Sequence, residues 1–509
     1  MRSQKLFLLA FLLISGCVAL PPHTNELVLY AYPETSTTLL GRSASDFYSR
    51  NKIDRSQSGL SLIQNAADAY IARITLVRLA EKSLDLQYYL YHDDQTGSFL
   101  FNELWKAAER GVRIRLLLDD MDVHRNDSNL ALLAQHPNIN IKTFNPFDRK
   151  YFKGIQYVTK FGKVTRRMHN KLFIADNQFA ILGGRNIGDE YFGADSDKAF
   201  VDLDVAIIGN KVKEASYAYD LYWNHQLSYT PEELNIRTPQ LNIIETGEQL
   251  NSYAKSIKSS NFEEALSKST LPIKIASNNI SFVIAETEVL YDHPDKIIKE
   301  NSQNKLLTKL IPYLSNIQKE LILITPYFIP GEEGVDFLKT LALRGITVKI
   351  LTNSYASTDV PLVHAAYTNY RKTLVESGVE IYELAIANDI SKKQHLKSGR
   401  SNSSLHAKYF SVDEKNIFIG SFNFDPRSAN QNTEIGIMIK SEVVTKKMLR
   451  SFNQLIEKNS FKLKIINGDL NWSKLIKGKE VLFDTEPNTT VIDRLYIKLM
   501  SKLPIESQL

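Results

Sequence analysis

The sequence predicts an α/β protein in which one fold is written twice, giving two mixed sheets flanked by helices and packed about a pseudo-two-fold axis. A strand–helix–strand order begins near residue 84 and returns near residue 320, and this order with short connections is typical of helices packed on a sheet. In addition, one frame, His-x-Lys followed four residues later by Asp, occurs in MHNKLFIAD at 168–176 and in LHAKYFSVD at 405–413. Two copies of one fold usually pack about an approximate two-fold axis.

The first half supplies its elements in a regular order. LDLQYYLY at 84–91 has strand propensity, SFLFNELWKAAERG at 98–111 is an amphipathic helix ended by its last glycine, and VRIRLLLDD at 112–120 is an apolar strand. A short β-like piece, INIKTF at 139–144, precedes the His-x-Lys frame.

The second half repeats these elements. ELILITPYF at 320–328 predicts a strand, VDFLKTLALRG at 335–345 a helix ended by glycine, and ITVKILTN at 346–353 a second strand. VEIYEL at 379–384 then stands where INIKTF stands in the first half. The repetition therefore extends well beyond the frame itself.

Composition shifts suggest the boundaries between domains. Residues 18–60 are rich in Ser and show no sustained period, and about 236–300 is rich in Asn, Ser, Lys and Glu, which is typical of tethers and linkers. We predict a signal peptide at 1–16, a tether at 17–60, a first domain at 61–235, a linker or insertion at 236–300, a second domain at 301–465 and a C-terminal membrane-proximal segment at 466–509.

The N-terminal leader indicates export. MRSQKLFLLAFLLISGC has two basic residues, an apolar run at 6–14 and then the only cysteine, Cys17. The run is too short to span a bilayer, so a signal peptide is expected instead of a transmembrane helix. The sequence before Cys17 resembles the bacterial lipobox, which predicts a lipoprotein. By the sorting pattern of such lipoproteins, Val18 favours the periplasmic face of the outer membrane over the inner one.

The net charge argues against a nucleic-acid partner. The formal charge is +5, and it falls to +3 once Arg2 and Lys5 of the leader are removed. A chain this close to neutral lacks the basic excess expected of a nucleic-acid binder. The charge remains compatible with an anionic membrane surface.

The duplication repeats specific chemical groups at one offset. His, Lys, Asp, Gly and Asn all recur 237 residues apart without an insertion. The side chains of interest are His169 and His406, Lys171 and Lys408, Asp176 and Asp413, and Asn186 and Asn423. Residues i and i+2 of a strand project to the same face, so each half is expected to offer one imidazole beside one ammonium group.

Together the two copies suit an anionic phosphodiester. Two ammonium groups and two amides can hold its non-bridging oxygens, the task that Mg²⁺ performs in other enzymes. A neutral imidazole can attack phosphorus while a protonated one donates to the leaving oxygen. Protonated lysine cannot ligate a metal, and no cysteine or clustered carboxylate completes a metal site. The sequence therefore predicts no metal and no cofactor.

With these two frames the chain resembles the phospholipase D superfamily, because both of them match its HxKxxxxD signature. The sequences around the frames are similar to those of the bacterial cardiolipin synthases, in particular of their C-type branch. They include GGRNIGDEYF at 183–192, GSFNFDPRSANQNTE at 420–434 and TPYFIPG at 325–331. The resemblance runs from about residue 60 to the C-terminus. It implies a duplicated phospholipase D-like fold.

The resemblance also implies roles. His169 would be the nucleophile that forms a phosphohistidine and His406 the general acid and then the general base, although the sequence leaves open which of them attacks. The implied phosphate-binding residues are Lys171, Lys408, Asn186, Asn423 and Ser421. Glu434 would orient His406, and its first-half counterpart would be Asp202 or Asp204 in VDLDV, with Asp202 favoured.

Three further candidates have weaker support. Asp176 and Asp413 are motif carboxylates, and a structural role through buried hydrogen bonds is expected of them. His364 in VPLVHAAYTNYR matches the family pattern and could line the pocket, although a lone helical histidine is more often structural. Gly184 stands where the second half has Ser421, so the two halves are chemically unequal.

Several functions fit these motifs. The leading hypothesis is a membrane-associated phosphatidyltransferase that forms cardiolipin from phosphatidylglycerol and a second phospholipid such as phosphatidylethanolamine. The alternatives are a hydrolytic phospholipase D that releases phosphatidic acid, a nuclease of the same superfamily, and a non-catalytic lipid-binding protein. Near-neutral charge argues against the nuclease. Every catalytic position is filled in both copies, which argues against a non-catalytic protein with a relic of an active site.

Overall fold

The computed structural model describes most of the chain, and its two halves repeat one arrangement. The described residues are 20–23, 27–54, 56–123, 127–194, 199–237, 241–256, 268–277, 279, 281–299, 305–385 and 403–509. The predicted signal peptide and Cys17 lie outside them.

The first half contains eight strands of the large sheet, the separate strand β7 and their covering helices. Its elements are α2 (Leu39–Asn51), β1 (Gln57–Ile63), α3 (Ala66–Leu79), β2 (Ser83–Tyr88), α4 (Gln95–Glu109), β3 (Arg113–Asp119), α5 (Asp120–Val123), α6 (Asp127–Leu133), β4 (Ile139–Phe144), α7 (Lys153–Thr159), α8 (Phe161–Val164), β5 (Leu172–Ala175), β6 (Phe179–Gly183), α9 (Asp189–Phe192), β7 (Ala199–Val201), β8 (Asp204–Ile208), α10 (Asn210–Trp223), β9 (Ser228–Tyr229), α11 (Ile243–Ser256) and α13 (Leu271–Ala276).

The second half repeats this set and extends it. Its elements are β10 (Val283–Tyr291), η1 (Pro294–Ile297), α14 (Leu306–Ser315), β11 (Glu320–Ile324), α15 (Gly331–Leu343), β12 (Thr347–Asn353), α16 (Pro361–Glu376), β13 (Glu380–Leu384), β14 (Ser403–Leu405), β15 (Tyr409–Val412), β16 (Asn416–Gly420), α17 (Pro426–Asn430), β17 (Ile435–Lys440), α18 (Glu442–Asn459), β18 (Ser460–Ile466), β19 (Asp469–Ile476), β20 (Lys479–Phe483), α19 (Val491–Met500) and η2 (Glu506–Gln508).

The two sheets have matching strand orders. The first runs β1-β8-β6-β5-β2-β3-β4-β9. The second runs β10-β17-β16-β15-β11-β12-β13-β18 and continues into β19 and β20. Both mix parallel pairs, such as β2 with β3, and antiparallel ones, such as β5 with β6. The predicted α/β fold with two mixed sheets is confirmed.

The equivalent strands β1 and β10 join the halves. They pair antiparallel, with Gln57 opposite Glu286 and Leu60 opposite Val283. An antiparallel pair of equivalent strands is the contact that a two-fold axis generates. Backbone hydrogen bonds therefore connect the two predicted sheets into one network of 18 strands.

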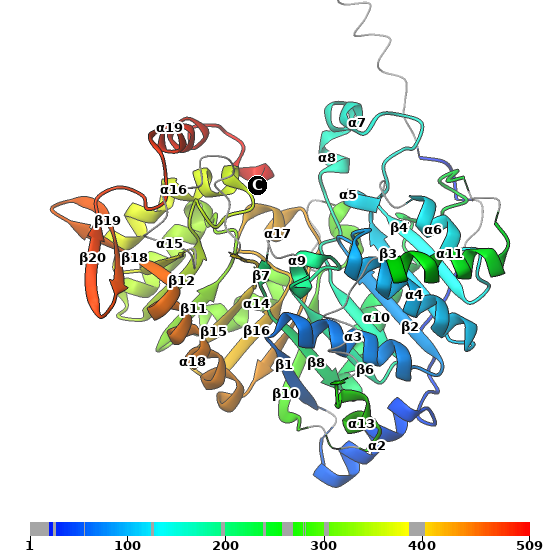
Figure 1. The fold of residues 1–509 in the computed structure, drawn as a ribbon. Helices are drawn as coiled ribbons and strands as arrows, with labels where there is room; N and C mark the ends of the chain where they lie inside the picture. Colours follow the sequence, from blue (N-terminus) through cyan, green and yellow to red (C-terminus); the bar gives the residue numbers. More distant parts are fainter. Residues whose placement is uncertain are drawn as a thin grey trace, which may run out of the picture.

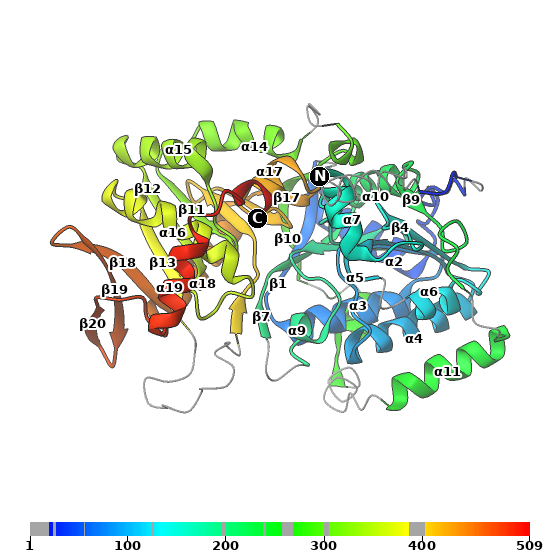
Figure 2. The same cartoon turned by 90° about the horizontal axis from the view of Figure 1, so that it is seen from above.

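Helices cover both faces of this network. One core cluster packs α3 and α4 on the outer face of the first sheet, and a second packs α15 and α16 on the outer face of the second sheet. A third cluster, with α10 and α18, is shared between the halves. Figure 1 shows the halves side by side, and in Figure 2 α15 and α4 lie at diagonally opposite corners, as an approximate two-fold axis along the view requires.

Three predicted boundaries are wrong. The predicted tether at 17–60 contains α2 and the start of the buried strand β1, and the predicted linker at 236–300 contains β10, which pairs with both β1 and β17. Both strands alternate apolar and polar residues, but polar flanking sequence hides that alternation. The C-terminal segment at 466–509 forms β19, β20 and α19 on the second domain.

The described helices do not include a membrane span. None of them is both long enough and apolar enough to cross a bilayer.

Candidate active site

The two His-x-Lys frames lie at the same edge of their sheets. His169 and Lys171 come just before β5 and not within it, and β5 runs antiparallel to β2, so the frame lies near the carboxyl end of β2. Each lysine folds back on its own frame. Lys171 Nζ donates to the carbonyl oxygen of His169 over 2.6 Å, and Lys408 Nζ donates to the carbonyl oxygen of His406.

The backbone of each frame crosses to the other half. Met168 forms a parallel bridge with Thr433, and β14, which ends at Leu405, pairs parallel with β7, which ends at Val201. The amide of His169 donates to the carbonyl of Thr433 over 2.9 Å, and the amide of His406 donates to the carbonyl of Val201 over 2.9 Å. Each histidine is therefore held beside a residue of the opposite half. His169 lies beside Glu434, which follows Thr433, and His406 lies beside Asp202, which follows Val201.

These crossings reverse the predicted carboxylate pairing. Nδ1 of His169 lies 2.9 Å from Oε2 of Glu434, and Nδ1 of His406 lies 2.6 Å from Oδ2 of Asp202. The prediction that Glu434 orients His406 is wrong, because the bridge at Thr433 carries Glu434 across the two-fold axis to His169. Each imidazole donates from Nδ1 to a buried carboxylate, which leaves Nε2 for chemistry.

Burial and the neighbouring cations set the charge of the imidazoles. Burial, and then Lys171, Lys408 and His406, lower the pKa of His169 well below its usual value. Burial and Lys408 also lower the pKa of His406, but Asp202 opposes them. Both rings are therefore neutral at pH 7 in the free site, and His406 is the easier of the two to protonate.

The pKa values of Glu434 and Asp202, the two carboxylates that hold the histidines, also differ. Burial raises the pKa of Glu434 to about 6, although Lys171 and Ser421 oppose the increase. Burial also acts to raise the pKa of Asp202, but His406 and Lys408 outweigh it and hold that pKa well below the usual value. Asp202 is thus firmly ionised and suited to stabilise an imidazolium at His406.

The lysines are buried cations. Burial lowers the pKa of Lys408 to about 8, while Asp202 and Asp359 oppose the decrease. Burial lowers the pKa of Lys171 well below its usual value, with Glu434 opposing. Binding an anion is favourable at such a site, because the negative charge of a bound phosphodiester would stabilise the protonated lysines that burial disfavours.

The Gly184 and Ser421 difference follows from the two carboxylates. A Cβ on Gly184 would lie 2.1 Å from Oδ1 of Asp202, so this position has no room for a side chain. Ser421 instead donates to Oε2 of Glu434 and accepts from the amide of Ile435 over 3.0 Å. In the structure the Ser421 hydroxyl therefore holds Glu434, and its phosphate-binding role stays a prediction.

Asp202 and Asp204, the two candidates in VDLDV, have separate roles in the structure. The chain leaves its β-pairing at 202–203, between β7 and β8. Asp202 then reaches His406, while Asp204 lies 3.0 Å from Nη1 of Arg73 and 3.3 Å from Nη1 of Arg185. Asp204 is thus part of a buried ion-pair cluster and does not orient a catalytic histidine.

The two predicted amides differ in their contacts. Asn186 accepts from the amide of Leu90 over 3.2 Å and donates to the hydroxyl of Tyr191 over 2.9 Å. Asn423 is buried, and its Oδ1 has no hydrogen-bond partner among the described residues. Asn186 therefore supports the wall beside His406, and Asn423 keeps hydrogen-bonding capacity for a ligand.

The motif aspartates stabilise turns. Oδ1 of Asp176 accepts from the amides of Lys82 and Ser83 over 2.8 and 2.9 Å, at the start of β2. Asp413 accepts equivalently from the amides of Lys319 and Glu320 over 2.7 and 3.1 Å, at the start of β11. Both aspartates lie at the opposite ends of β5 and β15 from the histidines and take no part in the site.

His364 belongs to a separate polar network. Its Nε2 lies 2.6 Å from Oε1 of Glu486, and Glu486 also accepts from Nη2 of Arg371 over 2.9 Å. His364 is therefore not placed in the site as predicted. Its buried contact with Glu486 ties α16 to the C-terminal segment.

Three residues of the site were missed by the sequence analysis. Tyr89 stands edge-on to His169, with ring centroids 4.9 Å apart, and Tyr191 stands edge-on to His406 at 5.2 Å. Arg427 also acts electrostatically on His169. Tyr89 lies in a run of tyrosines and Arg427 in a polar loop, and spacing alone does not show which members of such runs face a site.

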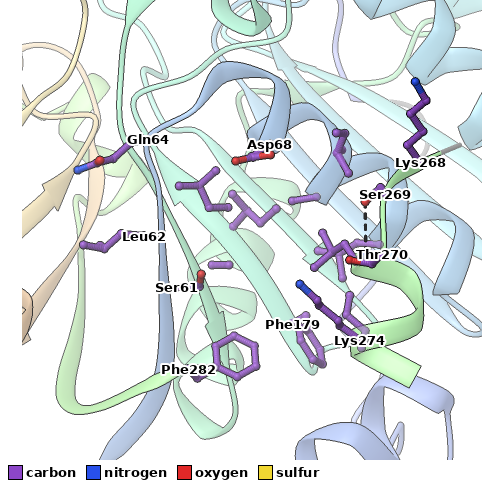
Figure 3. A pocket seen from close by; sticks show the side chains of 18 residues that line it. Ser61, Leu62, Gln64, Asp68, Phe179, Lys268, Ser269, Thr270, Lys274 and Phe282 are labelled. Atoms are coloured by element: carbon purple, nitrogen blue, oxygen red, sulfur yellow. Dashed lines mark hydrogen bonds between the residues drawn. The ribbon is translucent and has the colours of Figure 1, made fainter. Parts of the chain in front are cut away.

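A hollow elsewhere is a poor candidate for the site. It has a volume of about 520 Å³ and lies against β1, α3 and α13 (Figure 3). None of the motif residues lines it. Among the described residues, no group of three or more His, Cys, Asp or Glu side chains is arranged to hold a metal ion.

Comparison with known proteins defines the family. Residues 74–218 and 310–456 match the family described as "Cardiolipin synthase, PLD-like domain". These segments cover more than half of the chain and contain one His-x-Lys frame each. The chain therefore belongs to this family and carries its phospholipase D-like domain twice.

Individual relatives extend the match. Cardiolipin synthase C of Escherichia coli is 38% identical over 463 residues, covering 88% of this chain and 96% of that protein. A cardiolipin synthase of Clostridium perfringens is 27% identical over 412 residues, covering 80% of this chain and 71% of that protein. The crystal structure of phosphatidylserine synthase from Haemophilus influenzae aligns with a TM-score of 0.59 at 14% identity, covering 92% of this chain and 100% of that chain. At this identity the last likeness concerns the fold alone.

Proposed function

We propose that the protein is a phosphatidyltransferase that forms cardiolipin from phosphatidylglycerol and a second phospholipid through a phosphohistidine. The observation that carries this proposal is the pair of buried imidazoles, each held at Nδ1 by a carboxylate from the opposite repeat. Similarity to cardiolipin synthase C over most of both chains supports the choice of lipid substrate.

The reaction follows from this geometry in two steps. In the first, Nε2 of His169 attacks phosphorus, the N–P bond forms, and the P–O bond to the leaving alcohol breaks as His406 donates a proton to that oxygen. In the second, the hydroxyl of the acceptor phosphatidylglycerol gives its proton to His406 and attacks phosphorus, which releases His169. Lys171 and Lys408 stabilise the phosphoryl oxygens throughout.

The charges support this assignment of roles. His169 has the more strongly lowered pKa of the two rings and so presents the neutral nucleophile. His406 faces the firmly ionised Asp202, which stabilises the protonated ring that an acid needs. Substrate binding adds a negative charge to the site and makes that protonation easier.

Analysis of the lipid products tests the proposal. We expect the purified protein to convert labelled phosphatidylglycerol in vesicles, with or without phosphatidylethanolamine, to cardiolipin. The two lipid mixtures identify the second substrate. Phosphatidic acid as the only product would show that water is the acceptor and would replace the proposal with a hydrolytic phospholipase D.

The same assay tests metal independence. The ammonium groups of Lys171 and Lys408 stand where a metal would otherwise balance the phosphate charge, so turnover should be unchanged in excess EDTA. Loss of turnover on chelation, restored by Mg²⁺ or Zn²⁺, would contradict this mechanism.

We also propose that the chain is a lipoprotein on the periplasmic face of the outer membrane. This proposal is supported by the sequence before Cys17 and by Val18 after it. Several acyl chains at Cys17 would hold the protein firmly, at about 0.8 kcal/mol per buried CH₂. Cys17→Ser should release the protein from outer-membrane fractions at high salt, as measured by fractionation and blotting. Full retention of Cys17→Ser under these conditions would argue against lipidation.

A further inference from the structure

Exposed apolar side chains gather in several short segments of the described chain, among them residues 27–32 and two segments around helices. We call residues 151–161, around α7, the first tip and residues 491–503, around α19, the second tip. Four of the 26 exposed large apolar side chains lie in the first tip and six in the second. Phe152 is 77% exposed and Ile492 is 78% exposed, although apolar side chains of this size are normally buried.

Both tips are anchored to folded structure. In the first, Gln156 exchanges hydrogen bonds with the backbone of Asp148. In the second, Thr490 and Asp493 form a capping box, and Ile497 is buried beneath α19, which packs against α16. The exposed side chains are therefore displayed by ordered helices.

The two tips stand on the same side of the molecule. In Figure 1 α7 and α19 project from the upper surface, and Figure 2, seen from above, shows both in the foreground with the C-terminus between them. Arg427 connects the tips at this point, since it donates to the carbonyl of Thr165 after α8 and to the carbonyl of Gln508 after α19.

Residues that contact the tips, or the segments directly after them, act electrostatically on both histidines. The charge of Arg427, which bridges the tips, acts on His169. On the other side, Tyr355 is close to Asp493 and Tyr496 of the second tip, and the loop that follows it carries Asp359, whose charge acts on His406. A neighbour of the tips therefore acts on each of the two histidines, Arg427 on His169 and Asp359 on His406.

Basic residues accompany the apolar ones. Residues 150–166 contain Lys150, Lys153, Lys160, Lys163 and Arg166 and no acidic residue. The flanking Arg149 and Arg167 are paired with aspartates and do not contribute to this charge. The second tip has Arg494, Lys498 and Lys502 against a single acidic residue, Asp493. An apolar surface surrounded by positive charge complements an anionic bilayer, whose headgroups attract each Lys or Arg near the surface.

We propose that the two tips dock this face on an anionic phospholipid bilayer, so that the active site opens toward the headgroups between them. The inference rests on the proposed function, because a site that takes phospholipids must reach them in a membrane. Apolar side chains of interfacial helices enter the outer ~5–10 Å of a bilayer.

Fluorescent labels at single positions test the docking. Cys17 is the only cysteine, so in the Cys17→Ser chain an introduced Phe152→Cys, Ile492→Cys or Val443→Cys is the single labelling site. Val443 is a matched control, since it is 70% exposed on α18, at the opposite end of the molecule from the tips (Figure 1). Each variant carries a bimane label and is mixed with vesicles of phosphatidylglycerol and phosphatidylcholine.

We expect the emission of labels at 152 and 492 to shift to the blue on vesicle addition, while the label at 443 does not change. The shifts should weaken with pure phosphatidylcholine and at high salt, because the attraction is partly electrostatic. Unchanged emission at either tip, or an equal shift at 443, would overturn the proposal. A shift that depends on protein concentration but not on vesicles would assign the face to a second copy of the chain and would also overturn it.

A kinetic comparison gives a second readout. In Phe152→Ser/Ile492→Ser, the ratio of turnover on vesicles to turnover on a soluble phosphodiester should fall on the order of tenfold, because two large apolar anchors are lost. Val443→Ser should keep the parent ratio, and a fall of the same size there would contradict the proposal. The label shifts need no turnover, so a chain that docks without making cardiolipin would contradict only the proposed function.

Discussion

His169→Ala abolishes reaction with every phosphodiester, whereas His406→Ala keeps the first step on a substrate with a good leaving group. This is the result we expect if Nε2 of His169 forms the bond to phosphorus and His406 supplies the proton. A general acid contributes on the order of 10²–10⁴-fold to a natural alcohol leaving group. p-Nitrophenolate needs little protonation, so the absence of His406 should cost little in that step.

The measurement is a rapid-mixing assay with a p-nitrophenyl phosphodiester. His406→Ala should release a burst of p-nitrophenol and accumulate an acid-labile phosphohistidine at residue 169, because the missing base slows the second step. A burst in His169→Ala with the label at residue 406 would reverse the roles. Circular dichroism of both variants controls for folding, since both side chains are buried.

Each carboxylate variant should behave like the alanine variant of the histidine that the carboxylate contacts. Glu434→Gln should resemble His169→Ala, and Asp202→Asn should resemble His406→Ala. Glu434→Gln removes the carboxylate charge and turns one of its two acceptor oxygens into a donor, so the Nδ1 proton of His169 is no longer firmly held and nucleophilic attack should slow on every substrate. Asp202→Asn removes the charge that stabilises protonated His406, so its burst on the p-nitrophenyl substrate should survive. Loss of such an orienting carboxylate costs on the order of 10⁴-fold in a serine protease triad, and we expect an effect of about 10²–10⁴-fold here.

Asp204→Asn is the matched control for this experiment. Asp204 lies two residues from Asp202 but pairs with Arg73 and Arg185. Its loss should lower the free energy of unfolding by about 3–5 kcal/mol, as expected for a broken buried pair, without selecting one chemical step. If Glu434→Gln instead kept the burst and Asp202→Asn lost it, the crossed pairing would be wrong.

The crossed pairing gives a reason for the duplication. A single repeat contains a histidine and a carboxylate, but its carboxylate reaches the histidine of the other repeat. Neither half therefore holds a complete catalytic pair. The lipid-docking tips follow the same arrangement, since each half supplies one of them.

The duplicated α/β fold and the identity of the chemical groups can be predicted from the amino-acid sequence alone. The constant offset between the frames preserves each His-x-Lys spacing, and that chemistry is local to a few residues. Strands such as β3 and β12 were predicted almost to their ends, because an apolar run between turn residues has few alternatives. A structural role for Asp176 was expected as well, but the amides that it binds, at Lys82 and Ser83, lie more than 90 residues away in the sequence and were not.

Which of these groups act together depends on the folded arrangement of the two repeats. Glu434 lies 265 residues from His169, and Asp202 lies 204 residues from His406. No local pattern records such a pairing, because it is set by backbone bridges that cross between the repeats at Thr433 and Val201. The use of Ser421 to hold Glu434 and the space that Gly184 leaves for Asp202 follow from the same crossing. They depend on where two distant segments meet, and spacing along the chain does not fix that position.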